Sequence, residues 1–96
     1  MIKLHVNNEF SRLRAVVLGT AKTNGPAPTL EDTYDPKSAL HIKAGTYPKV
    51  SDMVVEIAAV CSIFEKYDVT VYRPSDIIDY NQIFSRDIGF VIEDKF

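Results

Sequence analysis

Apolar residues in this chain gather in three short runs and one longer segment. The run Leu13 to Thr20 reads Leu-Arg-Ala-Val-Val-Leu-Gly-Thr, and a β-branched run bounded by glycine is typical of a strand covered on both faces. Val69 to Arg73, which is followed by Pro74, predicts a second strand, and Gly89 to Glu93 predicts a third.

The longer segment, Asp52 to Tyr67, predicts a helix, with Ser51 as N-cap, acidic residues near its start and Lys66 in its last turn. One apolar stripe follows helical spacing and comprises Met53, Ile57, Val60, Cys61, Phe64 and Tyr67. A second stripe, on or near the opposite side, comprises Val55, Ala59 and Ile63. Because a surface helix of a monomer is ordinarily polar there, we expect this second stripe to pack on the proline-rich segment, on another subunit or on further chain.

Prolines and glycines interrupt residues 21–50, so no regular element can run through this segment. Asp35 followed by Pro36 offers an N-cap and a first helical residue, and Gly45 can close the far end, which predicts a short helix over Pro36 to Ala44. The Gly25-Pro26 pair and residues 45–48 lack the glycine spacing of a phosphate-binding loop. Residues 75–80 are expected to form a turn or a single helical turn.

The order strand, helix, strand predicts an α/β fold in which the two strands pair in parallel through a right-handed crossover. The length of 96 residues, with 46% apolar and 25% charged content, fits one compact domain whose stability is marginal without partners. Cys61 is the sole cysteine, so the chain can form no internal disulfide, and no cysteine and histidine spacing suggests zinc.

The charge balance, 11 basic against 13 acidic residues, gives a net charge of −2 with no run of either sign. Nothing in this pattern attracts nucleic acid. The longest mostly apolar segment, 53–64, is too short to span a bilayer and contains Glu56 and Ser62. We therefore expect a cytoplasmic protein with no nucleic-acid or membrane partner.

Polar chemistry concentrates in residues 81–87, which read Asn-Gln-Ile-Phe-Ser-Arg-Asp. This run places the aromatic Phe84, the cation Arg86 and the carboxylate of Asp87 immediately before the predicted third strand. A carboxylate accepts two parallel hydrogen bonds from a planar guanidinium, so Asp87 is a candidate guanidinium ligand. Taken alone, an Arg-Asp pair before a strand is more often a solvated turn.

The run 81–87 resembles the Asn-x-x-Phe-(Thr/Ser)-Arg-Asp signature of the arginine deiminase and amidinotransferase family, whose members act on guanidino compounds. A second stretch, residues 8–19, reads Asn-Glu-Phe-Ser-Arg-Leu-Arg-Ala-Val-Val-Leu-Gly and resembles the opening of the same family. The resemblance implies a pentein fold of five ββαβ-type units, of which this chain would hold one and a little more. It covers nearly the whole of this chain but roughly the first third of such an enzyme.

By that resemblance, Asp87 holds the guanidinium of arginine or a related substrate while a cysteine attacks its central carbon. Asn81 matches the residue that holds the substrate carboxylate in the deiminases. Phe84 is placed with these substrate-binding residues, and Arg86 is interpreted as a support for Asp87. Cysteine attack needs no metal or organic cofactor, so none is implied.

The catalytic cysteine and histidine of the family come from later parts of a longer chain. Cys61 is interpreted as a small buried hydrophobe, and His5 and His41 as structural or surface residues. We therefore expect an amino-terminal piece of such an enzyme, inactive by itself, which associates with the remainder of the enzyme or with further copies. Deiminase, amidinotransferase and dimethylarginine hydrolase activities are not distinguished by this stretch.

Two other interpretations stay open. The first is a small α/β binding or subunit-assembly module without catalysis, which the second apolar stripe favours. The second is a free-standing enzyme that uses Asp76, Asp79 or Asp87 as paired carboxylates. This is the weaker one, because solvation in a polar turn leaves Asp76 and Asp79 without the differing environments that an acid/base pair needs.

Overall fold

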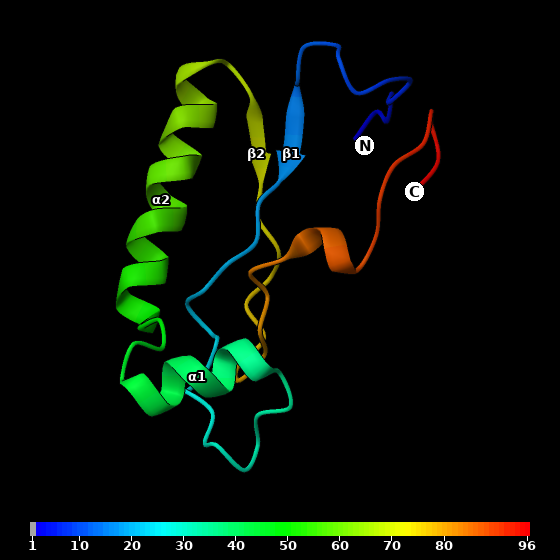
Figure 1. Cartoon of the computed structure of the whole chain (residues 1–96). Helices are drawn as coiled ribbons and strands as arrows, with labels where there is room; N and C mark the ends of the chain where they lie inside the picture. The colour runs from blue at the N-terminus through cyan, green and yellow to red at the C-terminus, as the bar shows by residue number, and fades with distance from the viewer. Residues whose placement is uncertain (1) are drawn as a thin grey trace.

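The structure of this chain is a computed structural model that describes residues 2–96. Its elements follow in the order β1 (Ala15–Val17), α1 (Pro36–Ala44), α2 (Val50–Lys66), β2 (Thr70–Tyr72) and η1, a 3-10 helix (Ser85–Asp87). Figure 1 shows α2 on one side of the two strands and the orange 3-10 helix on the other. The expected α/β class is confirmed in the form of a β-α-α-β arrangement.

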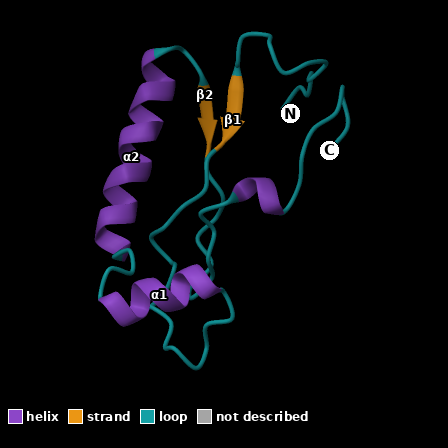
Figure 2. Ribbon diagram, viewed as in Figure 1, coloured by secondary structure: helices purple, strands orange, loops and turns teal. Residues whose placement is uncertain are grey.

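Strands β1 and β2 form a parallel pair, as predicted, with Val16 opposite Val71 and Val17 opposite Tyr72. Both strands are shorter than the apolar runs that predicted them, because the ladder ends when the chain after β1 changes partner. Leu18 still donates its backbone N–H to Tyr72, whereas the N–H of Thr20 donates to the carbonyl oxygen of Gln82. The chain just after β1 therefore lies beside the segment that precedes η1 (Figure 2).

The prediction of a third strand over Gly89 to Glu93 is wrong. In the described part of the chain, these residues make isolated antiparallel bridges, Val6 with Glu93 and Ile92 with Lys95. Glu93 has a φ of 55°, and this left-handed conformation turns the backbone so that Ile92 meets Lys95. Residues 81–87 therefore end in a short 3-10 helix and do not enter a strand.

Helix α1 has the predicted bounds, and both of its ends are capped as expected. The side chain of Asp35 accepts a hydrogen bond of 2.8 Å from the backbone N–H of Ser38. Gly45 ends the helix with a φ of 70°, a left-handed conformation that glycine adopts without strain. These local signals mark the two ends of the helix.

Helix α2 begins at Val50, two residues before the predicted start, and ends at Lys66, one residue before the predicted end. Its N-cap is Lys49 and not Ser51, and no side chain caps this end. The backbone N–H groups of Asp52 and Met53 both donate to the carbonyl oxygen of Lys49 at 3.1 Å. The first turn is therefore closed by the main chain at Lys49, and Ser51 lies inside the helix, so it is not the N-cap.

The inner side of α2 packs toward β2 and is half-buried; its apolar members are Val50, Met53, Val54, Ile57, Cys61 and Phe64. Val60 and Tyr67, which the sequence placed on this side, are exposed. The second stripe is also exposed, with Val55 at 68% and Ile63 at 57%. Within the described residues, the proline-rich segment does not cover it.

Much more surface is open than in a compact domain of this size. The chain exposes 8262 Å², whereas a folded monomer of 10.8 kDa exposes about 5,500 Å². The radius of gyration is 16.0 Å, against about 12.5 Å for a compact chain of this length. The exposed surface includes many large apolar side chains, and such surface is of the kind that packs against other protein. Across residues 2–96, none of the helices has the length and apolar character needed to cross a bilayer.

Candidate functional site

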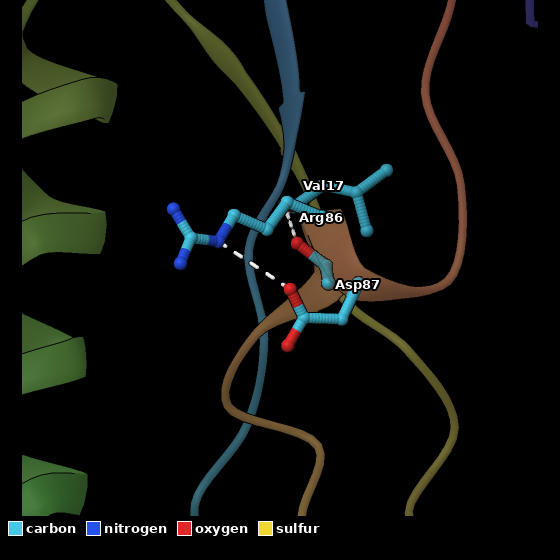
Figure 3. A network of polar contacts seen from close by, with 4 residues as sticks. Val17, Arg86 and Asp87 are labelled. Carbon is cyan, nitrogen blue, oxygen red and sulfur yellow. Dashed lines mark hydrogen bonds and ion pairs between the residues drawn. The ribbon is translucent and has the colours of Figure 1, made fainter.

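The two sequence stretches that carry the family resemblance lie in direct contact. Ser85, in η1, donates its hydroxyl hydrogen to the carbonyl oxygen of Val17, the last residue of β1, at 2.7 Å (Figure 3). Next to this bond, the N–H of Thr20 donates to the carbonyl oxygen of Gln82 at 3.0 Å. Thr20 itself is 1% exposed, so this junction is among the best-packed parts of the chain.

Gly19 allows the two stretches to approach each other closely. A side chain at Gly19 would overlap the backbone carbonyl groups of Gln82 and Ile83. From the other direction, the guanidinium of Arg73 donates to the carbonyl oxygen of Gly19 at 3.0 Å. The glycine at the end of the first apolar run thus permits backbone to pack on backbone.

Gln82 is the polar centre of the loop between β2 and η1, and sequence reasoning missed it. Its Oε1 accepts from the hydroxyl of Thr23 at 3.0 Å and from the backbone N–H of Ile77 at 2.8 Å. Its Nε2 donates to the carbonyl oxygen of Ser75 at 2.8 Å. All functional atoms of the amide are used, so Gln82 holds the loop that presents η1. No local pattern marks a glutamine for this role.

The predicted site residues Phe84, Arg86 and Asp87 come together at η1. Nε of Arg86 lies 3.4 Å from Oδ1 of Asp87, and Figure 3 shows the two side chains on the same side of the helix. Cζ of Arg86 lies 5.8 Å from the centre of the Phe84 ring, within the range of a cation–π contact. Both charged side chains are open to solvent, Arg86 at 85% and Asp87 at 63%.

Asn81 uses its side chain locally. Its Oδ1 accepts a hydrogen bond of 3.1 Å from the backbone N–H of Ile83, which forms an Asx turn at the start of the run. Asn8 begins the other stretch in the same way, because its Oδ1 accepts from the N–H groups of Phe10 and Ser11. Both asparagines therefore fix the entry of their segments.

The sole cysteine lies on the other side of the sheet from this site. Cys61 is in α2, where its thiol donates to Oε1 of Glu65 at 3.6 Å. His5 contacts Asn7 and His41 contacts Thr46, and both histidines are exposed. Asp76 and Asp79 are exposed residues of the loop before η1. No cysteine or histidine of the described residues joins Asp87.

The site is an open surface. Two hollows of about 360 and 380 Å³ lie elsewhere on the described part of the chain. One is lined by apolar residues of α2 and by the segments before β1 and β2, and the other by residues 88–96. No group of three metal-ligating side chains occurs in the part of the chain that is described.

Because Ser85 is hydrogen-bonded to Val17, the neighbouring Asp87 lies near the carboxyl end of β1. The carboxyl ends of the strands are where open α/β sheets bind ligands. What the arrangement offers chemically is a solvated carboxylate and an aromatic ring that both lie close to one guanidinium, that of Arg86, a combination suited to a planar cation. Comparisons of the chain with protein-family models, with curated proteins and with solved structures found no match. The contacts between the two stretches are therefore the main guide to function.

Proposed function

We propose that this chain forms the guanidinium-binding part of a guanidino-group-modifying enzyme of the arginine deiminase and amidinotransferase type. Asp87 binds the substrate guanidinium, Phe84 supplies an aromatic face, and Ser85 holds η1 on β1. The catalytic cysteine and histidine come from polypeptide outside these 96 residues, packed as further units of a pentein. The chain alone binds and does not turn over substrate.

The observation that supports this proposal best is the hydrogen bond from Ser85 to Val17. It joins two stretches that resemble one family independently of each other, although the two hydrogen-bonded residues are 68 positions apart. A chance match in an ordinary solvated turn gives no reason for such a contact. The exposed apolar area supports the second half of the proposal, because it is available for the missing units.

The substrate class follows from charge and shape. An open carboxylate with a neighbouring aromatic ring favours a flat, permanently charged guanidinium over a neutral ureido group. L-Arginine and L-citrulline form a suitable pair of ligands, since they share a carbon chain and differ in this group. A site this exposed is expected to bind arginine weakly, with a dissociation constant on the order of 1–10 mM.

Titration of L-arginine into the 96-residue chain, followed by NMR chemical shifts, tests the proposal. We expect shifts centred on residues 84–88 that are lost in Asp87→Asn and are not produced by L-citrulline. Asp76→Asn removes an exposed carboxylate from the preceding loop and serves as the matched control, which should respond like the parent chain. Shifts that persist in Asp87→Asn, or an absence of shifts both in the parent chain and in a variant that lacks the Arg86 guanidinium, would contradict the proposal.

A second candidate function is that of a non-catalytic assembly module. The exposed stripe of Val55, Ala59 and Ile63 on α2 favours it, because unpartnered apolar helix faces bind other protein. The two functions differ in the residues they need. Assembly depends on α2 and is unaffected by Asp87→Asn, whereas guanidinium binding depends on Asp87 and is unaffected by changes on the outer face of α2.

A further inference from the structure

We propose that Arg86 occupies the Asp87 carboxylate in the free chain as an internal guanidinium, so that an external guanidino ligand binds by displacing it. This inference rests on the proposed function, because it concerns the same carboxylate. In this inference Arg86 does not support Asp87 but competes with the ligand for it. Arg86 thereby sets the affinity and selectivity of the site.

Arg86 lies against the two groups that a bound guanidino ligand would use. Its Nε lies 3.4 Å from Oδ1 of Asp87, and its Cζ lies 5.8 Å from the centre of the Phe84 ring. A carboxylate and an aromatic face are the two protein groups that recognise guanidinium best. Arg86 thus contacts both the carboxylate and the aromatic ring that a substrate would need.

The pair is built so that it can be displaced. Charge-assisted hydrogen bonds between nitrogen and oxygen are about 2.7–2.9 Å long, and the contact of Arg86 is longer and involves one oxygen of Asp87. An external guanidinium can donate two parallel hydrogen bonds to both oxygens. Because both side chains are exposed, the paired arrangement outnumbers the open one by only about one- to fourfold, so that Asp87 is free in about a half to a fifth of the molecules.

The backbone does not need to move during this exchange. The Ser85 hydroxyl donates a hydrogen bond to the carbonyl oxygen of Val17, and the N–H of Asp87 donates to the carbonyl oxygen of Phe84 at 3.1 Å. Neither bond involves the Arg86 side chain. Arg86 can therefore rotate into solvent while η1, Phe84 and Asp87 stay in place.

Competition has a measurable consequence. The apparent affinity equals the intrinsic affinity multiplied by the fraction of molecules in which the site is free. Removing the Arg86 guanidinium should therefore tighten L-arginine binding by about two- to fivefold. Methylammonium carries its three N–H donors on one tetrahedral nitrogen, so it cannot offer the two parallel hydrogen bonds of a planar guanidinium and competes less well than methylguanidinium.

The experiment follows the Nε–H signal of Arg86 in the full chain by NMR during titration with methylguanidinium and L-arginine. Asp87→Asn gives the position of this signal when the side chain is released. We expect the parent signal to move to that position as ligand saturates, and Arg86→Met to bind L-arginine two- to fivefold more tightly. Arg14→Met, which removes an exposed arginine away from η1, should bind like the parent chain. Helical circular dichroism checks that each variant folds.

The outcomes separate the two proposals. If L-arginine binds in an Asp87-dependent way while the Arg86 signal stays fixed and Arg86→Met binds no more tightly, the displacement is wrong and the proposed function stands. If neither the parent nor Arg86→Met binds through Asp87, both fail. Binding that is detectable only in Arg86→Met supports both, because it shows the site occupied by Arg86 in the parent.

Discussion

Gly19 lies so close to the carbonyl group of Ile83 that hydrogen is the only side chain that fits between them. A methyl group there must push residues 82 and 83 away from β1. Gly19→Ala is therefore expected to destabilise the chain by about 1–3 kcal/mol, the usual range for overpacking. In a chain of marginal stability, a loss of this size unfolds a large fraction of the molecules.

Urea denaturation followed by circular dichroism measures this loss. Gly45→Asn is the matched control, because Gly45 has a positive φ but open space around it. Asparagine tolerates the left-handed conformation, so this change should cost less than about 1 kcal/mol. Equal midpoints for the parent and Gly19→Ala would mean that the approach to Ile83 is looser than described.

Ser85→Ala removes the hydroxyl that donates to Val17. We expect a loss of about 1 kcal/mol in the free energy of unfolding, together with faster amide hydrogen exchange at residues 85–88. Ser62→Ala is the control, because the Ser62 hydroxyl bonds within α2 to the carbonyl oxygen of Ala58. Its removal should leave exchange at η1 unchanged. Similar exchange at η1 in both variants would show that Ser85 does not anchor it.

Gln82→Ala should be more damaging than Ser85→Ala, since three hydrogen bonds of the amide are lost together. The expected loss is about 2–3 kcal/mol. Gln82→Glu keeps an acceptor for Thr23 and for the N–H of Ile77 but loses the donor to Ser75, so it should lie between Gln82→Ala and the parent. Urea midpoints of the three proteins give the order directly, and any other order contradicts the role of Gln82.

The pH dependence of α1 follows from Asp35. The backbone N–H of Ser38, which donates to this carboxylate, lowers the pKa of Asp35 below its ordinary value of 3.8. Because the pKa is lower in the folded state, the stabilisation is present above pH 3.8 and is lost as pH falls through the folded-state pKa. Cα chemical shifts of residues 36–44 should therefore lose helical character on acidification.

Asp35→Asn provides the control for this titration. Asparagine also caps helices but carries no proton that titrates in this range. In this variant, the Cα chemical shifts of α1 should be nearly independent of pH between 5 and 2.5. The Cα shifts of α2 report the general response of the chain to acid, which is subtracted. Parallel pH profiles for α1 in the parent and in Asp35→Asn would exclude Asp35 as the source.

The outer face of α2 is expected to drive association. Sedimentation of the parent chain should show mass increasing with concentration, and Val55→Glu combined with Ile63→Glu should reduce it. Leu40→Glu, in α1, also replaces an exposed apolar residue and tests whether any added charge has the same effect. The α2 variant should keep its helix, because surface changes of this kind usually alter stability by about 0.5 kcal/mol or less. A parent chain that remains a monomer at all concentrations contradicts this expectation.

Local signals predicted part of this fold well. The bounds of α1 follow from Asp35, Pro36 and Gly45, all adjacent to the helix they define. The start of α2 was placed two residues late because the carbonyl of Lys49, and not the side chain of Ser51, closes its first turn. The third strand was predicted wrongly because a strand needs a partner, and the apolar pattern of residues 89–93 cannot tell whether one is present.

The same distinction applies to the site. Phe84, Arg86 and Asp87 could be proposed because an aromatic ring, a cation and a carboxylate stand close together in a run that resembles a family signature; their chemical types alone favoured a solvated turn. The bond between Ser85 and Val17 and the role of Gln82 could not, since their partners lie far away in the sequence. Long-range contacts of a polar side chain leave no periodic pattern to detect.

The pairing of Val16 with Val71 also determines how this chain folds. More than half of the 96 residues lie between these two strands, and closing a loop of that length has an entropic cost that only the finished sheet repays. Helix α2 needs no such closure and can form early. We expect α2 to persist in partly folded molecules that have lost the sheet, so that the Asp87 surface is assembled last and is the first to be lost when the protein is destabilised.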